Sequence, residues 1–202
     1  MKKILISAAL ACLAMSSGAF AGGDADAGKD LATTCLACHG ETGNSMAPTF
    51  PNIAGQGEKY LLKQLKDIQS GNRPIPTMAG LLDNMSEQDL ADIAAYYAGQ
   101  ARSTGAAKEE LVELGESIYR AGIPRKNIAA CTACHAPSGN GNDLAKFPSL
   151  AGQWPEYTVQ QLKAFQSGER HNDGDSRMMR GVALDMNEQE MEAVASYIYG
   201  LK

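Results

Sequence analysis

Apolar residues recur at intervals of three and four positions in several stretches of the chain, as they do on one face of an α-helix. The clearest stretches are residues 58–70 and 155–167, and a glycine that suits a helix end follows each of them. Their apolar positions are Leu61, Leu62, Leu65 and Ile68 in the first stretch and Val159, Leu162 and Phe165 in the second. Because no stretch alternates convincingly between apolar and polar residues, we predict an all-α fold.

Two further helices are marked by their first residues. Ser86 and Asn187 are suitable N-caps, and an acidic residue three positions later, Asp89 or Glu190, completes a capping box. These helices are predicted to end near residues 99 and 200. Shorter helices are predicted at residues 26–33 and 111–120, and loops rich in Gly, Pro and Asn at residues 39–58 and 135–155.

The second half of the chain repeats the first. The segment CLACHGETGNS, which begins at Cys35, aligns with CTACHAPSGNG, which begins at Cys131. The alignment continues through the helices that follow, with small changes of offset. A repeat of this length is too long for a solenoid, so two tandem copies of one domain are the better explanation. We predict domains at residues 22–100 and 109–202, joined by a linker at residues 101–108.

Each copy contains the pentapeptide C-x-x-C-H. Two thiols at this spacing can form thioethers to the porphyrin vinyl groups, and the adjacent histidine can bind the iron. The cofactor prediction is therefore two covalently bound haem c groups. The predicted thioether residues are Cys35, Cys38, Cys131 and Cys134, and the predicted axial histidines are His39 and His135. A zinc knuckle and a thioredoxin-like thiol pair are the alternatives. A histidine directly after both pairs favours haem.

The beginning of the chain has the pattern of an export signal. Basic residues at Lys2 and Lys3 precede an apolar run at residues 4–14, which is shorter than the roughly 20 residues of a membrane span. An A-x-A cleavage site ends at Ala21. We predict a cleaved signal peptide at residues 1–21, which removes Cys12 as well. The expected location of the mature protein is the periplasm.

Charge narrows the class of partner. The formal net charge is −5, and it becomes −7 once Lys2 and Lys3 leave with the signal peptide. An acidic protein is a poor ligand for nucleic acid, so no nucleic-acid partner is expected. No later stretch is apolar enough to span a bilayer. The mature protein is therefore expected to be soluble or peripherally attached to the membrane.

Methionine is the usual sixth ligand where a haem only carries electrons, because its thioether favours ferrous iron. Met78 and Met179 align between the copies and fall in a predicted irregular loop between two helices. Met85 and Met186 also align, but each directly precedes an N-cap, where an apolar residue packs on the helix. We predict Met78 and Met179 as axial ligands of the iron, with Met178 as the rival in the second copy.

Three features leave alternatives open. His171 is either a further iron ligand or a solvated side chain. Pro51 and Pro148 either supply carbonyls that orient the axial histidines or merely stiffen a loop. Arg73 and Arg170, at matching positions, either pair with haem propionates or are ordinary surface charges.

The chain resembles the cytochrome c4 family, the di-haem class I c-type cytochromes. The resemblance is carried by C-x-x-C-H-x-x-x-G-N in both halves, FPNIAGQGEKYLLKQL, RPIPTMAGLL, LADIAAYYAGQ, RHNDGDSRMMRGV and SYIYGLK, which span nearly all of the mature chain. It implies two cytochrome c domains related by approximate twofold symmetry. It also implies His/Met ligation, which by position gives His39 with Met78 and His135 with Met179.

The family resemblance implies a respiratory electron carrier. The implied partners are a quinol-oxidising complex, quinol–cytochrome c reductase, as donor and a terminal oxidase or another acceptor, which dock transiently on a monomer. If both irons are six-coordinate, no position is open for O₂, peroxide or substrate, so we predict that the protein is not an enzyme. A di-haem enzyme such as a peroxidase and a fixed haem subunit of a larger oxidoreductase are the alternatives.

Overall fold

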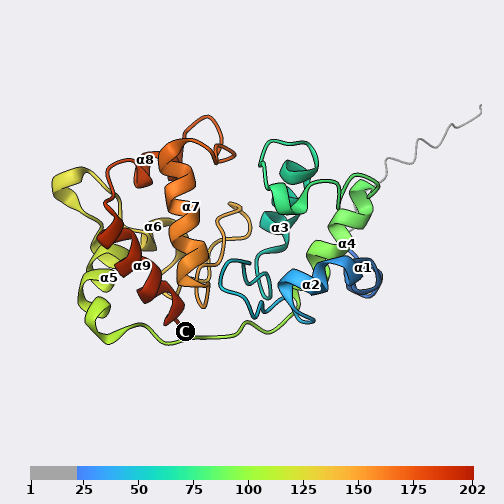
Figure 1. Cartoon of the computed structure of the whole chain (residues 1–202), viewed down its shortest axis with the longest axis horizontal. Helices are drawn as coiled ribbons and strands as arrows, with labels where there is room; N and C mark the ends of the chain where they lie inside the picture. Colours follow the sequence, from blue (N-terminus) through green and yellow to red (C-terminus); the bar gives the residue numbers. More distant parts are fainter. Residues whose placement is uncertain (1–21) are drawn as a thin grey trace, which may run out of the picture.

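The computed structural model describes residues 22–202, and the predicted signal peptide at residues 1–21, with Cys12, lies outside the described residues. Over residues 22–202 the regular structure is helical, without β-strands and with two isolated bridges between single residues. Two groups of helices lie side by side, and residues 101–108 run between them along one side (Figure 1). The predicted all-α class with two tandem domains is confirmed.

Each group holds four or five α-helices and short 3₁₀ helices. The first contains α1 (Ala25–Leu31), α2 (Leu36–His39), α3 (Glu58–Gln69) and α4 (Glu87–Ala98), with 3₁₀ helices at Ala32–Cys35 and Pro76–Met78. The second contains α5 (Glu109–Ala121), α6 (Thr132–His135), α7 (Pro155–Ser167), α8 (Met178–Ala183) and α9 (Glu188–Tyr199), with a 3₁₀ helix at Pro124–Lys126. No helix of this described part has the length and apolar character needed to cross a membrane.

The first and last helices of each domain cross at close range. A β-carbon on Gly28 of α1 would lie 2.0 Å from the carbonyl oxygen of Asp92 in α4. A β-carbon on Gly115 of α5 would lie 2.3 Å from the carbonyl oxygen of Ala193 in α9. Since only glycine permits such an approach, these two positions fix the crossing. Each crossing closes one side of a separate apolar core.

Both predicted capping boxes are present. Ser86 accepts from the N–H of Asp89 at the start of α4, and Asn187 accepts from the N–H of Glu190 at the start of α9. The second box has an extra partner, because the Lys126 ammonium donates to Glu190 over 2.7 Å. Burial raises the pKa of Glu190, but the hydrogen bonds from Lys126 and Asn187 and the nearby positive charges outweigh it and hold that pKa below its usual value.

We expect Glu190→Gln to lower the free energy of unfolding by about 1–2 kcal/mol at neutral pH, through loss of a charge-assisted hydrogen bond and part of the cap. Because the pKa is depressed in the folded state, this stabilisation is complete above the unfolded pKa of about 4.3 and is lost as the pH falls through the folded pKa. Urea denaturation between pH 7 and pH 3 measures it. The matched variant is Asp89→Asn in the box of the first domain, which lacks the lysine partner. Equal losses in both variants would contradict the role of Lys126.

The two domains exchange matched hydrogen bonds. Gln153 accepts from the N–H of Asn52 (2.9 Å) and donates to its carbonyl (2.8 Å). Gln56 accepts from the N–H of Ser149 (2.6 Å) and donates to its carbonyl (2.9 Å). Gln56 aligns with Gln153 in the repeat, and Asn52 aligns with Ser149. The exchange therefore relates the domains by an approximate twofold axis.

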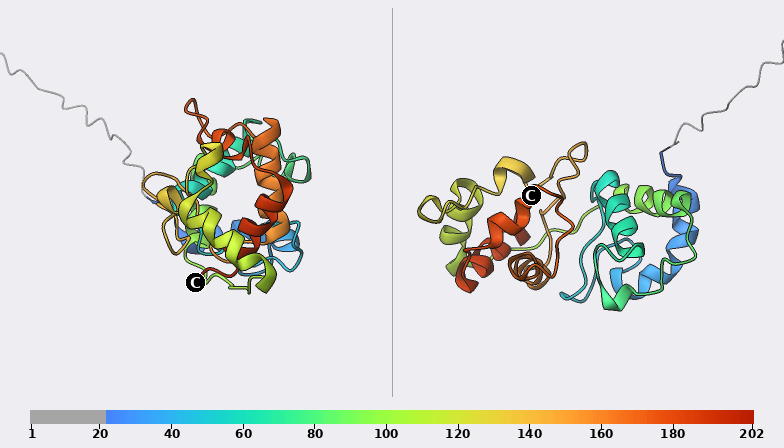
Figure 2. Two further views of the ribbon diagram at one scale, coloured as in Figure 1. Left: turned by 90° about the vertical axis from the view of Figure 1, so that its left-hand side faces the viewer. Right: turned by 90° about the horizontal axis from the view of Figure 1, so that it is seen from above.

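The segment at residues 101–108 has no helix or strand and is fixed to both domains. Asn44 of the first domain donates to the carbonyl of Ala101 and accepts from the N–H of Ser103. Arg102 donates to Ser149, and Gly105 donates to the carbonyl of Tyr199, both in the second domain. In the right-hand view of Figure 2, this segment passes from one helical body to the other.

Candidate functional site

One cavity of about 1230 Å³ extends across both domains. Its lining includes both C-x-x-C-H motifs and the facing sides of α3 and α7. Ligand pockets usually measure about 300–1,000 Å³, so this volume exceeds that of an ordinary single site. The repeat and the cavity therefore agree on two bound groups that lie in one continuous space.

Each motif occupies a single helical turn at the cavity wall. In the first domain the 3₁₀ helix ends at Cys35, and α2 carries Cys38 and ends at His39. In the second domain α6 follows Cys131 and ends at His135. A helical turn places the second cysteine of each motif and the histidine beside the first cysteine. None of these four cysteines forms a disulfide, and each pair borders the cavity.

The two axial-histidine candidates are oriented in the same way. Nδ1 of His39 lies 3.0 Å from the carbonyl oxygen of Pro51, and Nδ1 of His135 lies 2.9 Å from that of Pro148. Since a carbonyl only accepts, each Nδ1 carries the proton and each Nε2 keeps its lone pair. Of the two roles left open for Pro51 and Pro148, the contacts favour the one in which their carbonyls orient the histidines. Burial lowers the pKa of both imidazoles, which favours the neutral form that binds metal.

The methionines differ in their surroundings. Met78 ends the 3₁₀ helix Pro76–Met78, and both Met78 and Met179 border the cavity. Met179 packs against the core of the second domain, whereas Met178 also borders the cavity but is 46% exposed. Met186 is buried in the core and Met85 packs against the core of the first domain, as predicted for residues that precede an N-cap.

The structure corrects the expected loop around Met179. Met178 and Met179 are the first two residues of the helix α8. The preceding residue, Arg177, adopts a left-handed conformation (φ 50°) that starts this helix. The four additional residues of the second copy lie between Arg170 and Met179, mostly before this helix, and the aligned part of the first copy forms only the 3₁₀ helix Pro76–Met78. His171 is exposed and does not border the cavity, so its ordinary role as a solvated side chain is favoured.

The residues around the motifs suit haem better than the alternatives. Within residues 22–202 no three His, Cys, Asp or Glu side chains gather in a group able to hold a metal ion, so a zinc knuckle lacks its ligands. The buried hydroxyl of Tyr97 lies beside Cys35 and has no hydrogen-bond partner of ordinary geometry. A largely apolar space bordered by two cysteine sulfurs and an imidazole lone pair in each domain matches the demands of a covalently attached porphyrin.

Similarity to known proteins supports the interpretation of this site as a haem site. The family model described as Cytochrome c matches residues 25–99 and again residues 112–202. A relative from Stutzerimonas stutzeri named "Cytochrome c4" is 49% identical over 210 residues, covering 100% of both chains. The chain belongs to the cytochrome c4 family. The crystal structure of reduced recombinant cytochrome c4 from Pseudomonas stutzeri is 50% identical, with a TM-score of 0.88 over 89% of this chain and 100% of that chain.

The chain is also similar to a protein whose name states a specific electron donor. A protein of Stutzerimonas stutzeri (strain A1501) named "Thiosulfate dehydrogenase electron acceptor" is 36% identical over 170 residues, which cover 82% of this chain and 78% of the relative. As a member of the cytochrome c4 family, this chain is a di-haem electron carrier, and its two cytochrome c domains correspond to two haem c groups.

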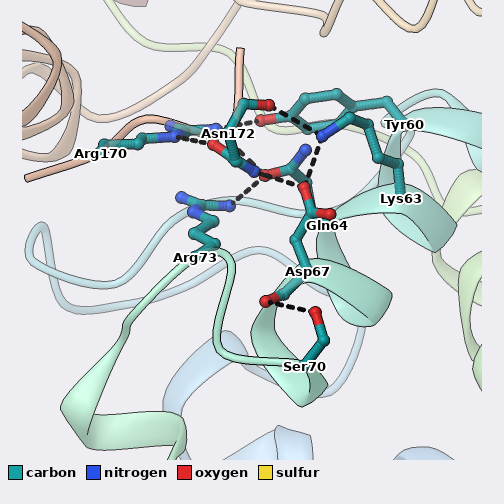
Figure 3. Close-up of polar contacts among 8 residues, drawn as sticks. All are labelled: Tyr60, Lys63, Gln64, Asp67, Ser70, Arg73, Arg170 and Asn172. Carbon is teal, nitrogen blue, oxygen red and sulfur yellow. Dashed lines mark hydrogen bonds and ion pairs between the residues drawn. The ribbon is translucent and has the colours of Figure 1, made fainter. Parts of the chain in front are cut away.

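Arg73 and Arg170 lie where this cytochrome c4 chain joins its two domains (Figure 3). Arg73 donates to Tyr157 (2.8 Å) and Gln161 (3.1 Å) of the other domain, and Arg170 donates to Tyr60 and Gln64 (both 3.1 Å). Both guanidinium groups are buried. The alternative that they are ordinary surface charges is therefore wrong.

The other polar residues of this interface were not predicted from the sequence. Gln56, Tyr60 and Gln64 recur in the second copy as Gln153, Tyr157 and Gln161. The identity of these residues in the two copies could have indicated the interface. Exposed polar positions have no reason to stay the same in two copies of a cytochrome c4 domain. Polar residues that repeat on the same face of a helix indicate a buried polar contact.

Proposed function

We propose that this chain carries single electrons in the periplasm between a quinol-oxidising complex and a terminal oxidase or another acceptor. The proposed thioether pairs are Cys35 with Cys38 and Cys131 with Cys134. The proposed axial pairs are His39 with Met78 and His135 with Met179. The proposal includes removal of residues 1–21 on export, a monomeric mature protein and only peripheral contact with the membrane.

The observation that carries the proposal is the duplication of one ligand set in one cavity. In each domain an imidazole held by a proline carbonyl and a methionine that ends or begins a short helix border the same space. When bound, the haem groups supply one-electron Fe(III)/Fe(II) chemistry. The histidines and methionines would together supply two protein ligands to each iron, which would leave no position for a substrate and favours a carrier over an enzyme.

Arg73 and Arg170 support the placement of two anionic haem groups. Both border the cavity, and their hydrogen-bond acceptors among the described residues are neutral amide and phenol oxygens. The carboxylate of Asp67 acts on Arg73 through its charge but does not accept a hydrogen bond from the guanidinium. A buried guanidinium without a hydrogen-bonded carboxylate is costly unless an anion approaches it. We propose that the haem propionates supply that charge.

A second candidate concerns the electron donor. The relative named as an electron acceptor of thiosulfate dehydrogenase favours a sulfur-oxidising enzyme as the source of electrons. The two candidates share the carrier chemistry and differ only in the protein that docks. Stopped-flow reduction of the oxidised chain by each purified donor distinguishes them, since the physiological donor reduces it at a rate that falls steeply with ionic strength.

Carbon monoxide tests whether both irons are closed. We expect the reduced haem-loaded protein to bind no carbon monoxide on the timescale of mixing, because the two methionines occupy the sixth positions. Absorption spectra after mixing measure this. The Met78→Ala variant is the positive control, and it should bind one equivalent. Rapid binding of one equivalent by the unaltered protein would overturn the carrier proposal in favour of an enzyme with an open iron.

A further inference from the structure

The peptide group that follows Pro51 or Pro148 makes two hydrogen bonds, one to its own domain and one to the other domain. The carbonyl of Pro51 accepts from Nδ1 of His39 (3.0 Å), and the N–H of the same peptide group, which belongs to Asn52, donates to the side-chain oxygen of Gln153 (2.9 Å). The histidine belongs to the first domain and the glutamine to the second. One planar peptide group therefore connects an axial-histidine candidate to a side chain of the opposite domain.

The second domain repeats this arrangement with the roles exchanged. The carbonyl of Pro148 accepts from Nδ1 of His135 (2.9 Å), and the N–H of Ser149 in the same peptide group donates to the side-chain oxygen of Gln56 (2.6 Å). Two occurrences related by the approximate twofold axis argue against a chance contact.

Both glutamine side chains are held in place. The side-chain oxygen of Gln153 also accepts from the N–H of Trp154 (3.0 Å), and that of Gln56 accepts from the N–H of Gly57 (3.0 Å). A backbone N–H can only donate, so the atom that faces it must be the amide oxygen. All four groups of the exchange are buried, with exposed fractions of 8% or less. Hydrogen bonds are stronger and polarise one another in such surroundings.

We propose that Gln153 tunes the haem of the first domain through the Pro51 peptide, and that Gln56 tunes the haem of the second domain through the Pro148 peptide. An acceptor on the peptide N–H makes the carbonyl of that peptide more negative. The carbonyl then draws the Nδ1 proton of the histidine more strongly and makes the imidazole a stronger electron donor. A stronger donor stabilises Fe(III), so each glutamine lowers the reduction potential of the haem in the other domain. This inference rests on the proposed histidine ligation.

Potentiometric titration of the haem-loaded Gln153→Ala and Gln56→Ala variants tests the proposal. Neighbouring hydrogen bonds of a chain strengthen one another only modestly, by about 10–30%. We therefore expect the reduction equilibrium constant to change by about two- to fourfold, or about 18–36 mV for one electron. We expect Gln153→Ala to raise the potential of the first-domain haem and Gln56→Ala to raise that of the second-domain haem. In the reduced protein, the Nδ1 proton resonance of the opposite-domain histidine should move upfield.

Two controls distinguish tuning from a merely loosened interface. Asn172→Ala removes hydrogen bonds to Gln64 and Asp67 across the same interface and the hydrogen bond that Asn172 accepts from Arg170 of its own domain, but it touches neither peptide. Looser packing admits water, which favours Fe(III) and lowers potentials, so Asn172→Ala is expected to lower them or leave them unchanged. A fall in potential in the glutamine variants, or a rise confined to the haem of the altered domain, would overturn the proposal.

The outcomes also separate this inference from the proposed ligation. Variants that keep the low-spin spectrum and exclude carbon monoxide retain closed irons, so an absent potential shift in them counts against the tuning alone. Carbon monoxide binding by the unaltered protein counts against the ligation instead. If Gln153→Ala does not fold, Gln153→Met keeps the volume and removes the acceptor, and the same rise is expected.

Discussion

Met78→Ala abolishes the methionine–iron charge-transfer band of one haem, and Met179→Ala abolishes that of the other. Each change also lowers the potential of the affected haem by at least the 59 mV that corresponds to a tenfold change in the reduction equilibrium constant. The physical reason is that a thioether favours Fe(II) and the water that replaces it does not. Near-infrared spectra of the oxidised protein and potentiometric titration measure both effects.

Met178→Ala is the matched control. Met178 is adjacent to Met179 on α8 and also borders the cavity, but almost half of its surface is exposed. Met179, in contrast, packs against the core of its domain. We expect both charge-transfer bands to survive Met178→Ala. Loss of a band in this variant, with retention in Met179→Ala, would transfer the ligand role from Met179 to Met178.

Arg73→Gln is expected to lower the potentials of both haems. The Arg73 guanidinium reaches from the first domain to Tyr157 and Gln161 of the second, so its charge lies between the two halves of the cavity. Removing a buried positive charge stabilises Fe(III), which carries one more positive charge than Fe(II). The same positive charges act on Tyr60: burial raises the pKa of this phenol, but the charges of Arg170 and Arg73 lower it overall.

Arg120→Gln is the control for the loss of one positive charge. Arg120 pairs with Glu116 on the exposed surface of α5, where solvent screens its charge. We expect no measurable change of either potential in this variant. Arg73→Lys keeps the charge but loses the forked geometry, and it should recover most of the potential. If Arg73→Gln changed the reduction potential of the first-domain haem alone, the charge of Arg73 would act on one haem and not on both.

The elements predicted correctly are those whose signals are local. The apolar spacing of residues 58–70 and the stop at residue 71 are properties of neighbouring residues, and α3 follows them closely. The capping boxes at Ser86 and Asn187 are equally local. The predicted helix at residues 26–33 was less accurate, because α1 ends at Leu31 and continues as a 3₁₀ turn into Cys35.

The burial of polar residues between the two domains was not predicted, for a different reason. A polar residue usually indicates an exposed position, so the sequence alone suggests that Arg73 and Gln64 are exposed. They are buried because their partners lie in the other domain, 84 to 106 positions away along the chain. The helix α8 was not predicted, although its residues align without insertion with residues 77–82 of the first copy. Site residues within a motif were therefore predictable from local signals, whereas the groups that position them from the other domain were indicated only by their identity in the two copies.

The exchange of the two glutamines has a consequence for assembly. Two matched surfaces that donate and accept the same bonds form an isologous contact, the type by which two identical subunits make a homodimer. Here both surfaces belong to one polypeptide, so the tether at residues 101–108 replaces an encounter between molecules with one inside a molecule. Tethers of this kind give effective concentrations on the order of millimolar. The two redox centres therefore stay paired at any protein concentration, unlike those of a homodimer, which separate on dilution.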